Sequence, residues 1–240
     1  MWQEKFKVLK DVFDLYTERN LFHMQSQGHF DGLESPIGVG KEANTFSATR
    51  GKGRVLVKIY RLSTCDFNRM YDNIRADPRF ENLRHHPRKV VFAWAKREAM
   101  NLVKLHYAKV RVPMLIAVRD NILIMDFVGD PAPQLKKQPP QEPKKFFEQV
   151  VRQMCLMAKA GFVHGDLSPY NILNCEEKPV IIDVSQATTF LHPHAQDLLN
   201  RDVRNICTYF RKLAVEADEE QLTQRIRSVL KQRSTRKKYG

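Results

Sequence analysis

Four polar residues at fixed spacing, set between apolar runs, constrain this chain most strongly. His164, Asp166 and Asn171 lie in the stretch "VHGDLSPYNILN", and Asp183 ends the apolar run "VIID" that follows. A buried loop has no need of two carboxylates, an amide and an imidazole, because polar groups buried without partners are costly. A site that handles phosphate groups does need them. The pattern therefore predicts such a site on a loop and on the strand after it.

The frame His-x-Asp-x-x-x-x-Asn is similar to the catalytic loop of protein kinases. Phosphoryl transfer asks the protein for positioning and charge neutralisation more than for covalent chemistry. We expect Asp166 to orient or deprotonate the attacking hydroxyl and His164 to be an orienting, structural residue. Asn171 and Asp183 offer oxygen ligands to Mg²⁺, which also keeps waters and substrate phosphates in its coordination shell.

A lysine stands where a charge is out of place, on the apolar strand "VLVKIY". Burying Lys58 is costly unless it is paired. The functional interpretation is a lysine that holds the α- and β-phosphates of ATP, with Glu98 of the following helix as its partner. The alternatives are a lysine at a strand edge and a solvated helix glutamate.

The stretch "GVGKEAN" lies between the first two predicted strands. Gly38 and Gly40 would let backbone amides approach phosphates, and with Lys41 and Glu42 they form a candidate lid over a nucleotide. Alone, this motif is equally a plain hairpin.

Met125 and Phe127 close a predicted strand just before the proline-rich connector "DPAPQLKKQPPQEP". A two-lobed nucleotide enzyme would hydrogen-bond adenine to the backbone at this point, although Met125 could equally belong to the core. The connector is the candidate hinge between lobes.

Periodicity and turn residues predict an α+β chain with two lobes. In the first half we expect an N-terminal helix over 3–24, three strands over 30–60 with breaks at "PIGVGKEAN" and "TRGKGR", and a mobile insertion over 61–86. A long helix should follow from Pro87, and then a hairpin that turns at Asp120–Asn121. The second half should contain helices over 144–160, 194–213 and 219–232 before a frayed basic tail. The predicted divisions are an N-terminal helix (1–28), a first lobe (29–128) that contains the flexible insertion, and a second lobe (129–240).

Composition limits the class of protein. The 240 residues, 42% of them hydrophobic, suffice for one core or one two-lobed domain. We find no apolar run long enough for a membrane span and no signal peptide, so a cytoplasmic protein without a membrane partner is expected. A net charge of +13 favours an anionic partner such as nucleic acid or nucleotide, against the plainer alternative of solvated lysines. Four scattered cysteines predict reduced thiols.

Over most of its length the chain resembles the RIO family of atypical serine/threonine protein kinases. The motifs are "GKEANTF", "VKIYRLSTCDF", "HGDLSPYNIL" and "IIDVSQA", followed by "HPHAQDLLNRDVRNI". The resemblance implies a kinase-like fold with ATP and Mg²⁺ or Mn²⁺ as cofactors. It implies that Asp166 is the catalytic aspartate, that Asn171 and Asp183 bind the metal ion, and that Lys58 binds the ATP phosphates. It also implies a transient aspartyl-phosphate on Asp183, and so an ATPase switch as well as a kinase.

Within the family, the chain resembles the first subfamily in its archaeal form. The features that indicate this are the motif "IDVSQ" and the lack of room for an N-terminal winged helix. This implies work on the pre-ribosomal small subunit, on its rRNA and proteins, and phosphorylation of a protein substrate or of the kinase itself. Ser63 and Thr64 are the candidate autophosphorylation sites. The chain departs from the family at Pro169, where relatives often carry an acidic residue. The stretch after Asp183 also lacks a usual activation segment.

Two other functions share part of this pattern. Small-molecule phosphotransferases of the aminoglycoside or choline kinase type have the same "HGD…N…ID" core. They add a sizeable helical region after the metal aspartate, and little chain follows Asp183 here. A non-enzymatic RNA scaffold on an inactive kinase fold is the third option. The joint presence of Lys58, Asp166, Asn171 and Asp183 argues against it.

Overall fold

A computed structural model describes residues 13–63 and 65–239, with side chains described as far as Lys231. The chain divides into two compact units. The first unit contains residues up to Ala99 together with Leu115–Phe127, and the second contains Met100–Met114 and everything from Val128 onward. The long helix α4, Pro87–Tyr107, therefore contributes residues to both units.

The first unit is built on a five-stranded antiparallel sheet in the order β1-β2-β3-β5-β4. The strands are β1 Gly32–Val39, β2 Ala43–Arg50, β3 Gly53–Tyr60, β4 Leu115–Arg119 and β5 Ile122–Asp126. The three expected N-terminal strands and the hairpin at Asp120–Asn121 are thus present.

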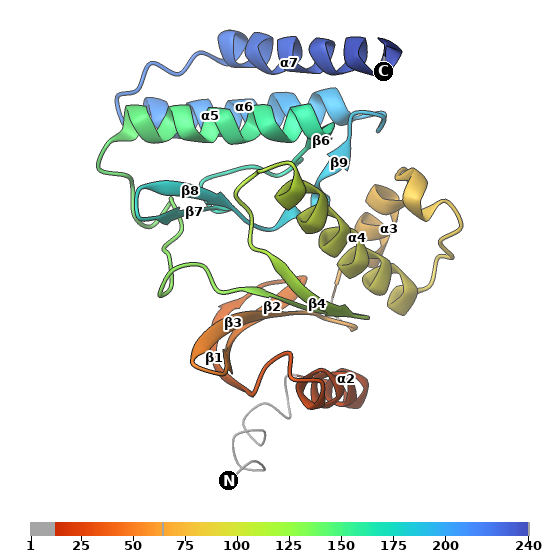
Figure 1. Cartoon of the computed structure of the whole chain (residues 1–240). Helices are drawn as coiled ribbons and strands as arrows, with labels where there is room; N and C mark the ends of the chain where they lie inside the picture. Colours follow the sequence, from red (N-terminus) through yellow and green to blue (C-terminus); the bar gives the residue numbers. More distant parts are fainter. Residues whose placement is uncertain (1–12, 64, 240) are drawn as a thin grey trace. The chain divides into compact units, whose positions relative to one another are not determined.

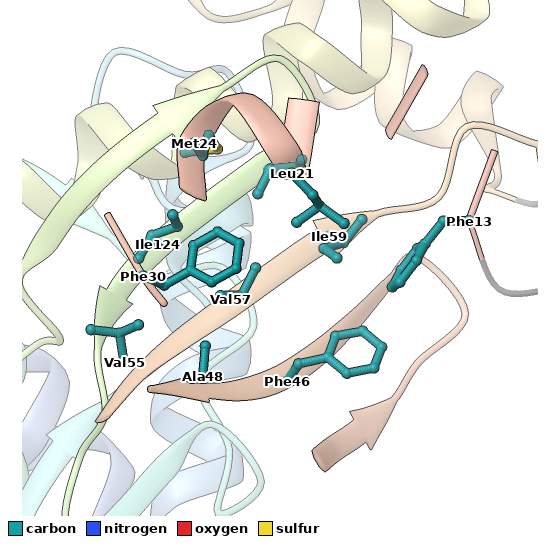
Figure 2. Packing of buried hydrophobic residues seen from close by; sticks show 11 residues of the cluster. Phe13, Leu21, Met24, Phe30, Phe46, Ala48, Val55, Val57, Ile59 and Ile124 are labelled. Carbon is teal, nitrogen blue, oxygen red and sulfur yellow. The ribbon is translucent and has the colours of Figure 1, made fainter. Parts of the chain in front are cut away.

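Helix α2, Leu15–Ser26, packs on one face of this sheet. Its buried Leu21 and Met24 belong to the same apolar cluster as Val57 and Ile124 of the sheet (Figure 2). Because side chains alternate along a strand, the residues of β3 between these core positions, Lys58 among them, face the other way.

Two boundaries in this unit differ from expectation. The Asp14 carboxylate accepts a hydrogen bond from the Thr17 amide at 2.9 Å and caps α2, so the helix begins at Leu15. The earlier part of the predicted helix, with Phe6 and Leu9, lies outside the described residues. Strand β1 also continues through Pro36, where its register with β2 shifts. An edge strand tolerates proline at such an irregularity, which is why "PIGV" is strand rather than a break.

The segment 61–86 is not the aperiodic loop that its polar sequence indicated. It contains helix α3, Phe67–Arg75, and the 3₁₀ helix η1, Pro78–Phe80. Met70 and Ile74, one helical turn apart, are fully buried. With only these two buried positions in a short and largely polar segment, the helical spacing was not evident. The flexibility of this segment stays a prediction.

In the second unit, helices α5 (Pro143–Ala160), α6 (Ala195–Arg211) and α7 (Glu219–Tyr239) lie side by side (Figure 1). Gly161 ends α5 at a φ of 88°, as its place after the helix predicted. Helix α7 runs past the expected end near residue 232, so the backbone of the basic tail is helical and not frayed. Two small antiparallel sheets complete the unit: the hairpin of β7 (Ile172–Cys175) and β8 (Lys178–Ile181), and the pair of β6 (Phe162–Val163) with β9 (Thr188–Thr189), which are distant in the sequence.

Candidate active site

The predicted lysine–glutamate pair is formed inside the first unit. Lys58 Nζ lies 2.8 Å from Glu98 Oε1, joining β3 to α4. Lys58 is 7% exposed and Glu98 is 1% exposed. A buried ion pair needs good geometry and further hydrogen bonds to offset the loss of hydration. The lysine therefore does not lie at a solvated strand edge, and the glutamate is not solvated.

The glycine-rich loop is a tight turn between β1 and β2. The Gly40 amide donates to the Ala43 carbonyl at 2.9 Å. A Cβ at Gly40 would lie 2.9 Å from that same oxygen, which explains the glycine. Lys41 is exposed and Glu42 half-buried, while Gly38 lies at the end of strand β1. Because the Gly40 amide is already engaged, it could reach a phosphate only if the turn opened.

Met125 and Phe127 stand at the end of the first unit. Met125 is buried in β5 and pairs with Leu56 and Leu115, as an ordinary core residue would. The connector that follows is less free than its prolines indicated. The Leu135 amide donates to the Ile172 carbonyl at 2.8 Å, so from this point the connector is fixed to the second unit. Its role as a hinge stays a prediction.

The predicted catalytic loop lies between β6 and β7 of the second unit. The Asp166 amide donates to His164 Nδ1 at 3.3 Å, and His164 Nε2 lies 3.1 Å from the Ile182 carbonyl. The buried imidazole thus ties the loop to the strand that leads to Asp183, as expected of an orienting residue. Gln186 Nε2 donates to Asp166 Oδ2 at 3.4 Å and helps to orient that carboxylate.

Asn171 and Asp183 are brought together by the backbone between them. The Ile182 amide donates to the Asn171 carbonyl at 3.0 Å, which places Asp183 next to Asn171 along the paired strands. The side-chain amide of Asn171 donates to the Asp166 carbonyl at 2.8 Å. Its nitrogen is thus engaged, and its oxygen is the atom left for a cation.

Asp183 was expected to lie on the strand after the loop. Its backbone instead adopts the left-handed region, with a φ of 53°. For a residue with a side chain this costs roughly 1–3 kcal/mol, and such residues cluster at functional sites. Ser185 Oγ donates to Asp183 Oδ1 at 2.8 Å, and the carboxylate lies at the surface. Together with the Asn171 oxygen, this donor set suits Mg²⁺, whose remaining ligands are normally waters and phosphates.

Three residues of α6 that the sequence did not single out hold the catalytic loop. The carboxylate of Asp202, 1% exposed, accepts from the Gly165 amide at 2.8 Å and from the Leu167 amide at 2.7 Å. Arg201 donates to the Gly165 carbonyl, and Asn205 donates to the Leu167 carbonyl at 3.1 Å. Burial raises the pKa of Asp202 above its usual range, although both backbone hydrogen bonds oppose this. An acidic residue on the apolar face of a helix was the available signal.

Asn101 is a second residue that sequence reasoning missed. It is 0% exposed, and its side-chain amide donates to the carbonyls of Val184 and Ala187 at 2.9 and 2.7 Å. These carbonyls belong to the short turn η2, Val184–Gln186, and the residue after it. Asn101 therefore fixes the turn that follows Asp183.

The four cysteines were predicted to be reduced thiols. All four cysteines are free. Throughout the described chain, no helix is long and apolar enough to cross a membrane. The described side chains also contain no group of three or more His, Cys, Asp or Glu that could hold a metal ion. Between Asp183 and α6 there are only η2 and β9, so the usual kinase activation segment is missing.

Comparison with solved structures identifies the fold. A Rio2 kinase from Chaetomium thermophilum, crystallised as an ADP/Mg²⁺–phosphoaspartate complex, superposes with a TM-score of 0.65. The superposition covers 90% of this chain and 75% of the other at 20% sequence identity. The fold is thus the two-lobed α+β fold of a protein kinase.

Sequence comparison then gives the family. The profile of the RIO domain matches residues 43–222, and the Rio1 serine/threonine-protein kinase of Haloferax volcanii is 42% identical over 91% of this chain and 77% of its own length. That of Methanocaldococcus jannaschii is 38% identical over the same shares, and the human RIO1 kinase is 34% identical over 86% of this chain and 38% of its own length. The chain belongs to the RIO family and is a RIO-type serine/threonine protein kinase. The predicted resemblance to archaeal members of the first subfamily is confirmed, and the small-molecule phosphotransferase is not favoured.

Proposed function

We propose that this kinase transfers the γ-phosphoryl group of Mg²⁺-bound ATP to a hydroxyl of a protein, with Asp166 as the catalytic aspartate. The observation that carries the proposal is the fixed presentation of Asp166, Asn171 and Asp183 by one hydrogen-bonded loop. Mg²⁺ would be held by the Asn171 and Asp183 oxygens, and it would neutralise the phosphate charge that develops during transfer.

The chain's own groups would supply the rest of the chemistry. Lys58, held by Glu98, would bind the ATP phosphates in the first unit. Asp166 Oδ2 would accept the proton of the attacking hydroxyl while Gln186 keeps the carboxylate oriented. His164 would keep the loop backbone in place and move no proton, since both of its ring nitrogens face backbone groups.

We further propose that Asp183 itself accepts a phosphoryl group. Its carboxylate oxygen would bond to the γ-phosphorus as the bond to the β,γ-bridging oxygen breaks and ADP leaves; water would later release phosphate. The carboxylate lies at the surface, and the related Rio2 structure is described as a phosphoaspartate complex. Such a cycle would make the protein an ATPase. Autophosphorylation at Ser63, an exposed residue just after β3, belongs to the same proposal; its companion Thr64 lies outside the described residues.

Separate Asp166→Ala and Asp183→Ala variants test these roles. We expect ATP turnover to fall at least about 100-fold in both, because each change removes a group that acts in the transition state. Mass spectrometry after incubation with ATP would locate any phosphate on Asp183 or Ser63. Asp197→Ala, an exposed change on α6, is the matched control. Unchanged turnover in either site variant would refute the role given to that residue.

We propose the pre-ribosomal small subunit as the physiological partner. The net charge of +13 supports an RNA-containing particle. ATP turnover should rise when purified small-subunit precursors are added, and mature subunits serve as the control. A rate that neither particle changes would argue against this partner and leave the kinase activity untouched.

A further inference from the structure

Tyr60 makes a buried contact with the Lys58–Glu98 ion pair. The proposed nucleotide chemistry gives this tyrosine no role. It lies two residues after Lys58 on β3 and is 1% exposed. Its hydroxyl donates to Glu98 Oε2 at 2.5 Å, whereas Lys58 Nζ holds the other oxygen, Oε1, at 2.8 Å. The two carboxylate oxygens of Glu98 thus have different donors from the same strand.

The two donors come together because of strand periodicity. Residues two apart on a strand point to the same face of a sheet. Lys58 and Tyr60 therefore both point toward α4, which carries Glu98, and away from the core that α2 covers. The terminal torsion of a glutamate is broad. One donor leaves the carboxylate plane free to turn, and a second donor fixes it.

The backbone of Tyr60 is itself held in place. Its amide donates to the Asn121 carbonyl, and the side chain of Asn121 donates to the Tyr60 carbonyl, both at 2.8 Å. The same side chain donates to Thr17 Oγ1 of α2 at 3.0 Å. Asn121 comes from the β4–β5 turn, so this turn and α2 together fix the position on β3 from which the phenol reaches Glu98.

We propose that Tyr60 is a positioning residue for ATP: its hydroxyl holds Glu98 so that Glu98 holds Lys58 in place for the phosphates. The inference rests on the proposed role of Lys58 and goes beyond it, because it assigns a third member to the pair. The Tyr60 ring also lies 5.1 Å from Lys58 Nζ and gives the ammonium an aromatic neighbour. The hydroxyl and the ring are therefore separable in an experiment.

The test is a Tyr60→Phe variant, which removes the hydroxyl and keeps the ring. Hydrogen bonds to charged groups suggest a loss of ATP affinity of about 10-fold. We expect this as a rise in KM for ATP with kcat for ATP turnover within about 2-fold, and as a matching fall in affinity for a non-hydrolysable ATP analogue measured by calorimetry. Tyr209→Phe removes a comparable hydroxyl, 2.7 Å from the Leu135 carbonyl of the second unit, and should leave KM unchanged.

A double-mutant cycle shows whether Tyr60 acts through Glu98. In a Glu98→Ala background the hydroxyl has no carboxylate to hold, so adding Tyr60→Phe should change ATP affinity less than about 2-fold. An equal loss in both backgrounds would overturn the proposal, as would an unchanged KM in Tyr60→Phe. If Glu98→Ala does not fold, the split between KM and kcat in Tyr60→Phe alone decides.

Lys58→Ala separates this inference from the proposed function. If Lys58→Ala binds the ATP analogue normally, the nucleotide role of the pair itself is wrong. If Lys58→Ala loses affinity and Tyr60→Phe does not, only the role of Tyr60 is wrong.

Discussion

Asp202 shows how one residue can support a site without taking part in its chemistry. Its carboxylate accepts both the Gly165 and the Leu167 amides, on either side of Asp166. Without the Asp202 carboxylate, these two buried amides would lose their acceptor. An unsatisfied buried donor costs roughly 1–3 kcal/mol. The catalytic loop therefore depends on a residue of α6 for its shape.

An Asp202→Ala variant should be less stable by about 3 kcal/mol or more, because two buried amides lose a charged acceptor. Urea unfolding followed by circular dichroism would measure this. Asp202→Asn keeps one acceptor oxygen, so its free energy of unfolding should lie between those of the unmodified protein and Asp202→Ala. Asp197→Ala, exposed in the first turn of the same helix, should cost less than about 1 kcal/mol, and an equally small effect at Asp202 would contradict the loop-holding role.

At the scale of elements, helix α3 is anchored to α4 by a buried arginine. Arg97 Nη1 donates to the Asn73 carbonyl at 3.1 Å, and its guanidinium lies 4.2 Å from the centre of the Trp94 ring. Burial lowers the pKa of Arg97 to about 10, while the nearby Asp77 carboxylate raises it. A charge is thus kept inside the first unit to hold the last turn of α3.

We expect Arg97→Met to release α3 while the sheet stays intact. Amide hydrogen exchange over 67–75 should become about 10-fold faster, in keeping with the loss of one hydrogen bond from a charged donor. The exposed Lys96→Met is the matched control, since it removes a neighbouring positive charge from the same helix. Unchanged protection of α3 in Arg97→Met would show that Met70 and Ile74 hold the helix without help. Exchange in the unmodified protein also tests whether 61–86 is flexible outside α3.

At the scale of the whole molecule, the charge is concentrated in places as well as high overall. Residues 84–89, "RHHPRK", are all exposed and stand at the start of α4. Cations at the positive end of a helix dipole do not stabilise the helix. This run is therefore a reasonable first place to test contact with RNA.

Binding to small-subunit rRNA should weaken steeply as salt rises, because each neutralised phosphate releases counterions. Reversing Arg84, Arg88 and Lys89 to Glu should reduce the slope of log affinity against log salt, as fluorescence anisotropy would show. Reversing Lys136, Lys137 and Lys144, also exposed, gives a control of equal charge. Equal reductions of the salt slope in both triple variants would mean that RNA binding depends on net charge alone. An affinity that does not change with salt would mean that the protein does not contact phosphates.

Much of the fold and the candidate site could be predicted from local patterns. The alternation in "VLVKIY" sets which face Lys58 takes, and the glycine after α5 marks the end of that helix. The spacing from Asp166 to Asn171 places both on one loop. Helix α3 was missed because it is short and largely polar, with only Met70 and Ile74 buried. The strand through Pro36 was missed because proline usually ends a strand.

The sequence by itself determined which chemical groups this kinase has and in what order, since the periods of strands and helices and the shape of a short loop depend on neighbours along the chain. Only the tertiary structure decided how those groups are held. Tyr60 reaches Glu98, Asn101 reaches the turn after Asp183, and Asp202 reaches the catalytic loop, each across a long stretch of chain. Such contacts depend on how separate elements pack in three dimensions, and no local pattern records that packing.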